Sequence, residues 1–226
     1  MRQIALDTET TGLEPALGHR IIEIAGIEIV NRRITGKHFH CYLNPDRDID
    51  AGAQNVHGIT REFLKDKPTF AQTAEEFLAY IKNTELIIHN ANFDVGFINH
   101  ELALLNPKSH QITKYCKITD TLSMARQRHP GQKNNLDALC KRYDIDNSKR
   151  DLHGALLDAR LLAQVYLAMT GGQGTLFGDE TQNFHPHGQP TKKRSNHALR
   201  VIKATSEEEA LHNQRILEVE EIARHS

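Results

Sequence analysis

An apolar run close to the amino terminus ends in two carboxylates that alternate along the chain. Residues 3–6 read Gln-Ile-Ala-Leu, and Asp7-Thr8-Glu9 follows directly. The run predicts a short buried strand, and side chains two residues apart on a strand share one face. Asp7 and Glu9 should therefore project together at the carboxyl end of this strand, where they repel each other unless a cation or a proton neutralises them. Taken alone, a D-x-E pattern is more often an acidic turn than a functional site.

Three later segments add polar groups to this pattern. An apolar strand over residues 86–89 is followed within a few residues by Asp94, and a strongly apolar helix opens between His153 and Asp158. A short helix over residues 135–143 lies just upstream of that apolar helix. Together these segments favour a functional acidic site over an isolated acidic turn.

The chain resembles the DEDDh family of 3′→5′ exonucleases, which is named for four acids and a histidine, at Asp7, Glu9, Asp94, His153 and Asp158. The resemblance covers residues 1–172 and includes the flanking words DTETTG, HNANFDVGF and LHGALLDA. It implies a ribonuclease H-like fold of the α/β class, in which helices cover a mixed β-sheet. The hydrophobic pattern alone, a meander followed by alternating helices and strands, predicts only a mixed sheet covered by helices.

The resemblance also implies a chemistry. Phosphodiester hydrolysis requires an activated water and neutralisation of the attacking and leaving oxygens, which two divalent cations about 4 Å apart can supply. In the family pattern Asp7 bridges both ions and Asp94 supports one of them. Glu9 and Asp158 hold the other ion, next to the attacking water. Mg²⁺ is the expected ion and Mn²⁺ its substitute, because hard cations prefer oxygen ligands.

His153 is the candidate general base. Histidine side chains ordinarily titrate near pH 6.5, which suits proton abstraction at neutral pH. On an ideal helix, five residues would separate His153 from Asp158 by roughly 140°, so the two side chains would not share a face. His153 is therefore expected in the segment before the helix, from which it can swing over the metal site. A tyrosine at this place would indicate the sister DEDDy group.

Several residues around the acids are expected to contact the terminal nucleotide. His89 and Phe93 flank Asp94 and could line the slot for the terminal base, although Phe93 taken alone fits a core position better. The loop around His57 resembles the family's loop against the terminal nucleotide, where the histidine contacts sugar or phosphate. Gly52 stands where the family usually carries a glutamate, so only a backbone contact can be assigned to it. The expected substrate-binding residues are Asp7, Glu9, Gly52, His57, His89, Phe93 and Asp158.

The remaining pattern predicts the order of the elements. β-branched residues over 21–30, together with segment 37–43, indicate two strands joined by a turn near 31–36. A capping-box pattern at Thr69 and Gln72 precedes a helical repeat of apolar residues that ends at Ile81. Further expected elements are strands over 86–89 and 115–118 and helices over 94–105, 119–128, 135–143 and 153–169.

Composition excludes several classes of protein. The net charge of the 226-residue chain is −1, so no overall positive field recruits nucleic acid. The three cysteines are scattered and fit small core residues in a reducing cytoplasm: Cys41, Cys116 and Cys140. We find no signal-peptide pattern and no membrane-spanning run, so a cytoplasmic protein is expected.

Most histidines lack a metal-binding setting and are expected at or near the surface, among them His38, His40, His185, His187 and His212. The neighbours of His57, His89 and His153 make those three the exceptions.

Composition changes sharply after Met169, which divides the chain into an exonuclease domain (1–172), a flexible tether (173–198) and a tail (199–226). The tether opens with Gln173-Gly174-Thr175-Leu176-Phe177, which has the form of bacterial sliding-clamp-binding peptides. In that reading Gln173 forms a hydrogen bond at the pocket rim, while Leu176 and Phe177 fill the pocket. The tail carries an apolar helical stripe that must be buried, either on a partner or on the chain's own catalytic domain.

The tether and tail resemble those of proofreading subunits of bacterial replicative DNA polymerases. The resemblance implies three partners besides DNA 3′ ends: the polymerase alpha subunit, the beta sliding clamp and, where it exists, the small theta subunit. Two alternatives stay open. A free-standing exonuclease that trims short RNA or tRNA ends would need neither the clamp peptide nor the tail. A scaffold without catalysis would not need all five catalytic positions.

Overall fold

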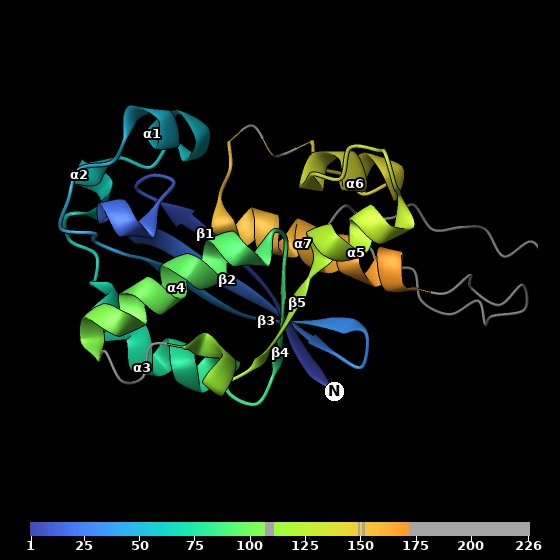
Figure 1. The fold of residues 1–226 in the computed structure, drawn as a ribbon, viewed down its shortest axis with the longest axis horizontal. Helices are drawn as coiled ribbons and strands as arrows, with labels where there is room; N and C mark the ends of the chain where they lie inside the picture. Colours follow the sequence, from blue (N-terminus) through green and yellow to red (C-terminus); the bar gives the residue numbers. More distant parts are fainter. Residues whose placement is uncertain (107–110, 149, 151, 172–226) are drawn as a thin grey trace, which may run out of the picture. The chain divides into compact units, whose positions relative to one another are not determined.

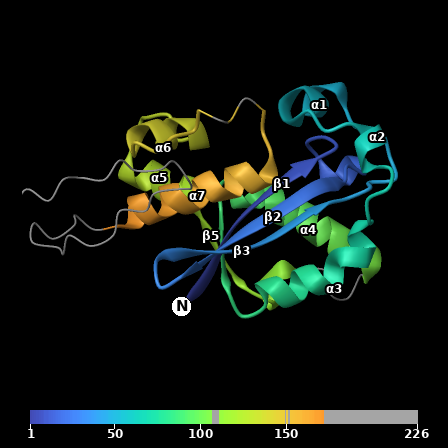
Figure 2. The ribbon, with the colours of Figure 1, turned by 180° about the vertical axis from the view of Figure 1, so that it is seen from behind.

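The computed structural model describes residues 1–106, 111–148, 150 and 152–171. Within these residues the strands form one five-stranded sheet in the order β3-β2-β1-β4-β5. β1 pairs antiparallel with β2 and parallel with β4, so the sheet is mixed. Helices cover both of its faces (Figure 1 and Figure 2). The predicted mixed sheet covered by helices is therefore confirmed, whereas the expected tether and tail lie outside the described residues.

The strands are β1 (Arg2–Thr10), β2 (Ile21–Val30), β3 (Arg33–Tyr42), β4 (Glu85–Ile88) and β5 (Lys117–Asp120). The helices are α1 (Ala51–His57), α2 (Arg61–Leu64), α3 (Phe70–Ile81), α4 (Ala91–Leu105), α5 (Thr121–Arg128), α6 (Leu136–Arg142) and α7 (Ala155–Thr170). Two short 3₁₀ turns, η1 (Pro15–Leu17) and η2 (Ile112–Lys114), complete the described elements.

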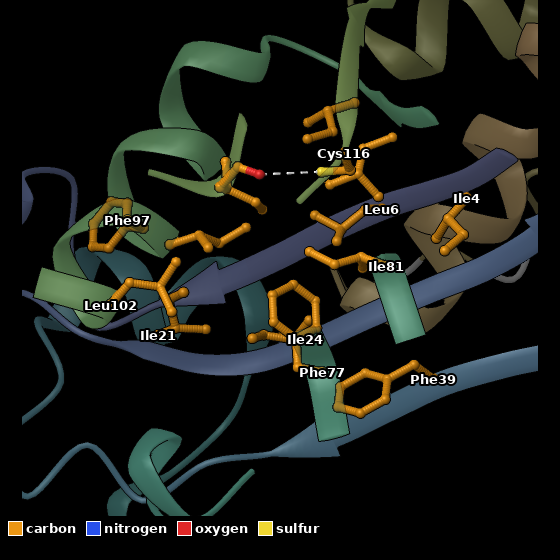
Figure 3. Close-up of a cluster of buried hydrophobic side chains, with 14 of the residues drawn as sticks. Ile4, Leu6, Ile21, Ile24, Phe39, Phe77, Ile81, Phe97, Leu102 and Cys116 are labelled. Carbon is orange, nitrogen blue, oxygen red and sulfur yellow. Dashed lines mark hydrogen bonds between the residues drawn. The ribbon is translucent and has the colours of Figure 1, made fainter. Parts of the chain in front are cut away.

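The alternation of side chains along β1 decides which of them reach the functional site. Ile4 and Leu6 are fully buried in the hydrophobic layer that α3 and α4 build on one face of the sheet (Figure 3). Burying each such side chain contributes about 1.5–3 kcal/mol, which anchors this half of the strand. Ala5 belongs to the opposite layer, with α6 and α7. Asp7 and Glu9 continue the Ala5 side and therefore point toward the face that α7 covers.

β1 is longer than predicted. The sequence pattern placed the two acids at the end of the strand, whereas the ladder with β2 continues through Asp7 and Glu9 to Thr10. The ladder with β4 covers only the segment from Gln3 to Ala5. The acidic half of β1 is therefore hydrogen-bonded to β2 along one edge only. Along its other edge β4 has already ended, and the chain continues into α4.

The hairpin between β2 and β3 is tighter than the predicted turn over residues 31–36. Asn31 and Arg32 both have left-handed backbones, with φ of 49° and 64°, and β3 begins at Arg33. Two consecutive left-handed residues form the turn that matches the twist of a hairpin. Asn favours this conformation but Arg does not, so the sequence signal for a two-residue turn was weak.

Other helices and strands begin or end a few residues away from their predicted boundaries. α4 begins at Ala91 instead of Asp94, after Asn90 with a left-handed φ of 65°. β5 lies two residues later than the predicted strand over 115–118. α3 matches its prediction, and the Thr69 backbone N–H donates to Gln72 Oε1 at 2.8 Å, as a capping box requires.

The segment around His57, which was expected to be a loop, instead contains the short helices α1 and α2. α1 ends at His57 and is capped by Gly58, whose φ of 70° suits glycine. A side chain at Gly58 would also collide with Leu152, because an added Cβ would lie 2.7 Å from Leu152 Cδ1. Leu152 thus lies directly against Gly58, so the end of α1 packs against the residues that precede α7.

Two minor expectations were wrong. Cys41 is only half-buried, although Cys116 and Cys140 are buried as predicted. His40 was expected to lack a carboxylate partner, yet its Nε2 lies 2.7 Å from Glu23 Oε1. The partner is on the neighbouring strand, which sequence spacing does not reveal. None of the helices in the described part of the chain is long and apolar enough to cross a membrane.

Candidate active site

Four carboxylates from three elements gather beside the second half of β1. Asp7 and Glu9 come from β1, Asp94 from the first turn of α4, and Asp158 from the first turn of α7. Asp94 and Asp158 are each 3% exposed, whereas Asp7 and Glu9 are half-buried. One ligand atom each of Glu9, Asp158 and His153 lies within 4.8 Å of the other two. The fold thus brings Glu9, Asp158 and His153 within 4.8 Å of one another, and it places Asp7 and Asp94 close enough for their charges to act on the other acids.

The electrostatics of this cluster favour binding of positive charge. Burial raises the pKa of Asp7 well above its usual value, and the charges of Asp94, Glu9 and Asp158 raise it further. Burial and the charge of Asp158 raise the pKa of Glu9 to about 8. Burial likewise raises the pKa of Asp94 to about 7. Such a cluster holds protons at neutral pH unless cations replace them.

Thr8 positions Asp94 from the opposite face of β1. Its hydroxyl donates to Asp94 Oδ1 at 2.7 Å, and both groups are buried. Because Thr8 alternates with Asp7 and Glu9, one strand supplies two acids on one face and the support of a third acid on the other. A β-branched polar residue between two acids therefore has a defined structural role here.

Arg150 is the basic group of the cluster. Its Nε and Nη2 donate to the two carboxylate oxygens of Asp158 at 2.6 and 2.7 Å. Its Nη1 donates to Asp137 Oδ1 at 2.6 Å, and its Nη2 lies 3.0 Å from His153 Nδ1. Arg150 therefore provides in this structure a positive charge on a predicted metal ligand.

The start of α7 is held by two backbone contacts. The His153 N–H donates to the Val56 carbonyl at 3.1 Å, and the Ala155 N–H donates to Glu23 Oε2 at 3.1 Å. His153 lies before the helix, as predicted, and its Nδ1 is 3.4 Å from Asp158 Oδ2. Its expected swing over the site stays a prediction.

His57 has an unsatisfied nitrogen beside the site. Its Nδ1 accepts a hydrogen bond from the Ile59 N–H at 3.0 Å. Its Nε2 is buried without a hydrogen-bond partner among the described residues. Because Nδ1 accepts, Nε2 carries the proton of the neutral ring and is available as a donor. Burial lowers the pKa of His57, which favours this neutral form.

The remaining predicted substrate residues occupy different environments. His89 points its Nδ1 to the Thr121 hydroxyl at 3.0 Å, and burial lowers its pKa. It also lines a pocket of about 610 Å³ together with residues of α5 and of the segment before α6. Phe93 is half-buried and packs on Phe97 with ring centroids 4.9 Å apart. Gly52 is exposed on α1, with open space around its Cα. Their roles in substrate binding stay predictions.

Sequence reasoning missed Arg150 and Glu23. Arg150 lies three residues before His153, and the available signal was a basic pair, Lys149-Arg150, close to the predicted base. Glu23 lies in an apolar strand opposite Glu9 in the β1–β2 ladder, and it is only 2% exposed. A carboxylate inside a buried strand indicates a specific partner, which the structure shows to be the start of α7.

The fold and the acidic cluster are those of an exonuclease. The family model described as Exonuclease matches residues 4–166, so the chain belongs to this family, whose members depend on divalent metal ions. The chain is 54% identical over 223 residues to the DNA polymerase III subunit epsilon of Escherichia coli (strain K12), with 95% of this chain and 92% of that protein covered. The subunit of the same name from Rickettsia felis is 50% identical over 217 residues, with 95% of each chain covered. The chain is thus a 3′→5′ exonuclease of the proofreading type, within the DNA polymerase III subunit epsilon family.

Solved structures agree on the fold. The exonuclease X structure in complex with 5′-overhanging duplex DNA matches with a TM-score of 0.56 and 25% identity, covering 74% of this chain and 89% of that one. The E. coli ExoI–ssDNA complex with bound zinc matches with a TM-score of 0.63 and 22% identity, covering 74% and 40%. These neighbours confirm the predicted ribonuclease H-like fold.

Proposed function

We propose that Asp7, Glu9, Asp94 and Asp158 hold two divalent cations, Mg²⁺ or Mn²⁺, at which the 3′-terminal phosphodiester of a DNA strand is hydrolysed. The observation that carries this proposal is the convergence of the four acids with raised pKa values for Asp7, Glu9 and Asp94. All four side chains offer oxygen ligands, which hard cations prefer. The fork of Arg150 on Asp158 also supports it, because a positive charge already occupies one of the carboxylates.

His153 acts in this proposal as the general base. Bound cations supply neutralisation of the charge that develops on the attacking and leaving oxygens. His153 takes a proton from a water whose oxygen then bonds to the terminal phosphorus. The bond between that phosphorus and the 3′ oxygen of the preceding nucleotide breaks. The leaving 3′ oxygen takes up a proton from solvent, so the products are a nucleoside 5′-monophosphate and a strand that is one nucleotide shorter and ends in a 3′ hydroxyl.

The residues beside the acids bind the terminal nucleotide. His57 donates from Nε2 to a sugar or phosphate oxygen, which would satisfy its unpaired nitrogen. Phe93 and His89 line the side on which the base enters, and Gly52 offers only backbone. Asp7, Glu9 and Asp158 would hold the cations that neutralise the terminal phosphate. Single-stranded or mispaired 3′ ends suit this site, because the terminal nucleotide must leave its partner to reach buried acids.

The partners follow from the relatives that carry the name of a polymerase subunit. We assign residues 1–172 to the exonuclease domain, 173–198 to a tether and 199–226 to a tail that binds the polymerase alpha subunit. Gln173, Leu176 and Phe177 contact the beta sliding clamp, and a theta subunit binds where the organism has one. The protein then works in the cytoplasm, within the bacterial replisome.

A metal-titration assay tests the chemistry. The full-length chain, stripped with EDTA, should release 5′-monophosphates from a 3′-mispaired DNA only after Mg²⁺ or Mn²⁺ is restored. The Asp7→Ala variant should stay folded and lose activity by several orders of magnitude, because Asp7 would be one of the carboxylates that hold the cations. Full activity in EDTA would contradict the proposal. Preference for short RNA over DNA would favour the free-standing RNA-trimming alternative.

Pull-down experiments test the partners. A chain ending at residue 172 should lose polymerase alpha binding and retain activity on single strands. Alanines at Gln173, Leu176 and Phe177 should weaken only the clamp contact, because two tethered contacts act separately. A triple variant that binds the clamp as tightly as the parent would remove the clamp assignment. Retention of alpha by the truncated chain would instead place the polymerase contact on the catalytic domain.

A further inference from the structure

The side chain of Arg150 is buried among the catalytic groups. It is 7% exposed, and the Asp158 side chain that it grips is 4% exposed. The guanidinium presents two N–H groups to both oxygens of Asp158, the strongest form of arginine–carboxylate pair. The fork occupies one lone pair on each oxygen of Asp158, and its positive charge opposes the binding of a cation to the same carboxylate. The contact therefore competes with the metal site proposed above.

Arg150 also blocks the candidate base. A guanidinium has only donors, so the 3.0 Å contact between Arg150 Nη2 and His153 requires Nδ1 of the ring to accept. The neutral ring then carries its proton on Nε2. In this arrangement neither ring nitrogen has a free lone pair with which to take a proton from water. One arginine thus engages both a metal ligand and the base.

A third contact keeps Arg150 at the site when the fork opens. Nη1 donates to Asp137, which lies in the first turn of α6 and whose side chain is 52% exposed. Asn147 donates to the same Asp137 oxygen at 3.0 Å. Asp137 is half exposed and is not one of the four proposed metal ligands, so it need not release Arg150 when cations bind.

We propose that Arg150 is the resident counter-cation of the metal-free site: it occupies Asp158 and Nδ1 of His153, and divalent metal displaces it from both while Asp137 retains it. This inference rests on the proposed metal site. Its consequence is that the base becomes available only when the site is loaded with metal. Arg150 is thus a positioning residue that couples the two events.

Metal binding to the full-length chain, measured by calorimetry with Mn²⁺, tests the competition. Arg150→Gln should tighten the Kd for Mn²⁺ by about tenfold, because a positive charge and a competing fork are both removed. It should also lower the Tm in EDTA by about 4 °C, while the Tm at saturating Mn²⁺ falls less. Arg150→Lys keeps the charge without the fork and should tighten the Kd by about threefold. This variant tests the proposal if Arg150→Gln does not fold.

Arg20→Gln is the matched control, because Arg20 makes the same fork on the buried Glu101, which is not one of the four acids. It should lower the Tm equally with and without Mn²⁺ and leave the Kd unchanged. If Arg150→Gln behaves like this control, Arg150 is only a structural tie between α6 and α7. If the parent chain binds no Mn²⁺ at all, the proposed metal site fails instead.

The tautomer of His153 provides a second, independent readout. Long-range ¹⁵N–¹H spectra of the parent chain in EDTA should show the His153 proton on Nε2 and an Nδ1 signal shifted by an accepted hydrogen bond, and this shift of Nδ1 should disappear when Mg²⁺ is added. Arg150→Gln should lack the Nδ1 shift already in EDTA. A His153 proton on Nδ1 in the metal-free parent would overturn the proposal, because Arg150 could not then donate to that nitrogen.

Discussion

Two arginines in this molecule make the same bidentate fork on a buried carboxylate, in very different surroundings. Arg20 donates to both oxygens of Glu101 at 2.8 and 2.7 Å, and the Ile21 N–H also donates to Glu101 at 3.1 Å. Arg150 donates to both oxygens of Asp158 at 2.6 and 2.7 Å. The first carboxylate is surrounded by its own donors, whereas the second stands among other acids.

The difference teaches that the neighbours of an ion pair decide its role. Glu101 is satisfied by groups that belong to the fold, so its arginine has no competitor. The charge of Asp158 raises the pKa of both Asp7 and Glu9, so any additional cation stabilises the whole cluster. Another cation can therefore replace Arg150 at Asp158. Breaking the Arg150–Asp158 pair and breaking the Arg20–Glu101 pair should have different effects.

The largest expected effect comes from Asp158→Asn. Activity should fall by several orders of magnitude, because a proposed metal ligand is lost. The fold should survive in EDTA, since Arg150 keeps its bond to Asp137. Turnover on a 3′-mispaired primer and the Tm in EDTA measure the two outcomes. Near-normal turnover would show that Asp158 is not a ligand.

His153→Ala should reduce turnover by about 10²–10⁴-fold, the range for loss of a general base. Metal affinity should remain close to that of the parent, because the four acids stay in place. Rates at saturating Mg²⁺ across the pH range, with Kd from calorimetry, separate these effects. An acidic limb of the pH–rate profile that is the same in the variant and the parent would argue against the assignment.

Glu101→Gln breaks the other fork and should have the opposite profile. It should destabilise the protein by about 3 kcal/mol, near the lower end for breaking a buried pair, because Arg20 is a quarter exposed. The loss should be the same in EDTA and in Mg²⁺, and the folded fraction should keep its turnover. Urea unfolding under both conditions measures this. A loss that Mg²⁺ reverses would connect Glu101 to the acidic site.

The smallest expected effect is the pH dependence of stability in EDTA. Folded Glu9, with a pKa of about 8, keeps its proton over a range in which the unfolded chain has lost it. The unfolded state therefore binds fewer protons, and stability should fall as pH rises from about 4.5 to 8. Glu9→Gln should flatten this fall by about 1–2 kcal/mol, after solvent screening is allowed for. Urea unfolding of both chains at pH 5 and pH 8 decides the sign.

Much of the fold was predictable because its signals are local. The apolar repeat and the cap at Thr69 predicted α3 with its correct bounds. The alternation of Asp7 and Glu9 placed both acids on one face of a strand. The length of β1 was not predictable, since the ladder that extends it to Thr10 depends on β2.

The site was predictable where it follows a linear pattern and not where it depends on contacts between elements. Four acids and His153 lie in recognisable words of sequence. Arg150 lies in none of them, and its role depends on α6 and α7 meeting. The role of Glu23 likewise depends on a contact between distant parts of the sequence, because its carboxylate accepts a hydrogen bond from the Ala155 N–H.

The alternation along β1 has a genetic consequence. Its apolar half is buried between two hydrophobic layers. The number of residues that separate Asp7 and Glu9 from this buried half therefore decides which face of the sheet the two acids occupy. Inserting a single codon between Leu6 and Asp7 would place Thr8 on the acidic face and turn both acids toward α4. The amino-acid content would hardly change, yet the chemistry would be lost. This stretch of the gene should therefore tolerate conservative substitutions far better than one-codon insertions or deletions.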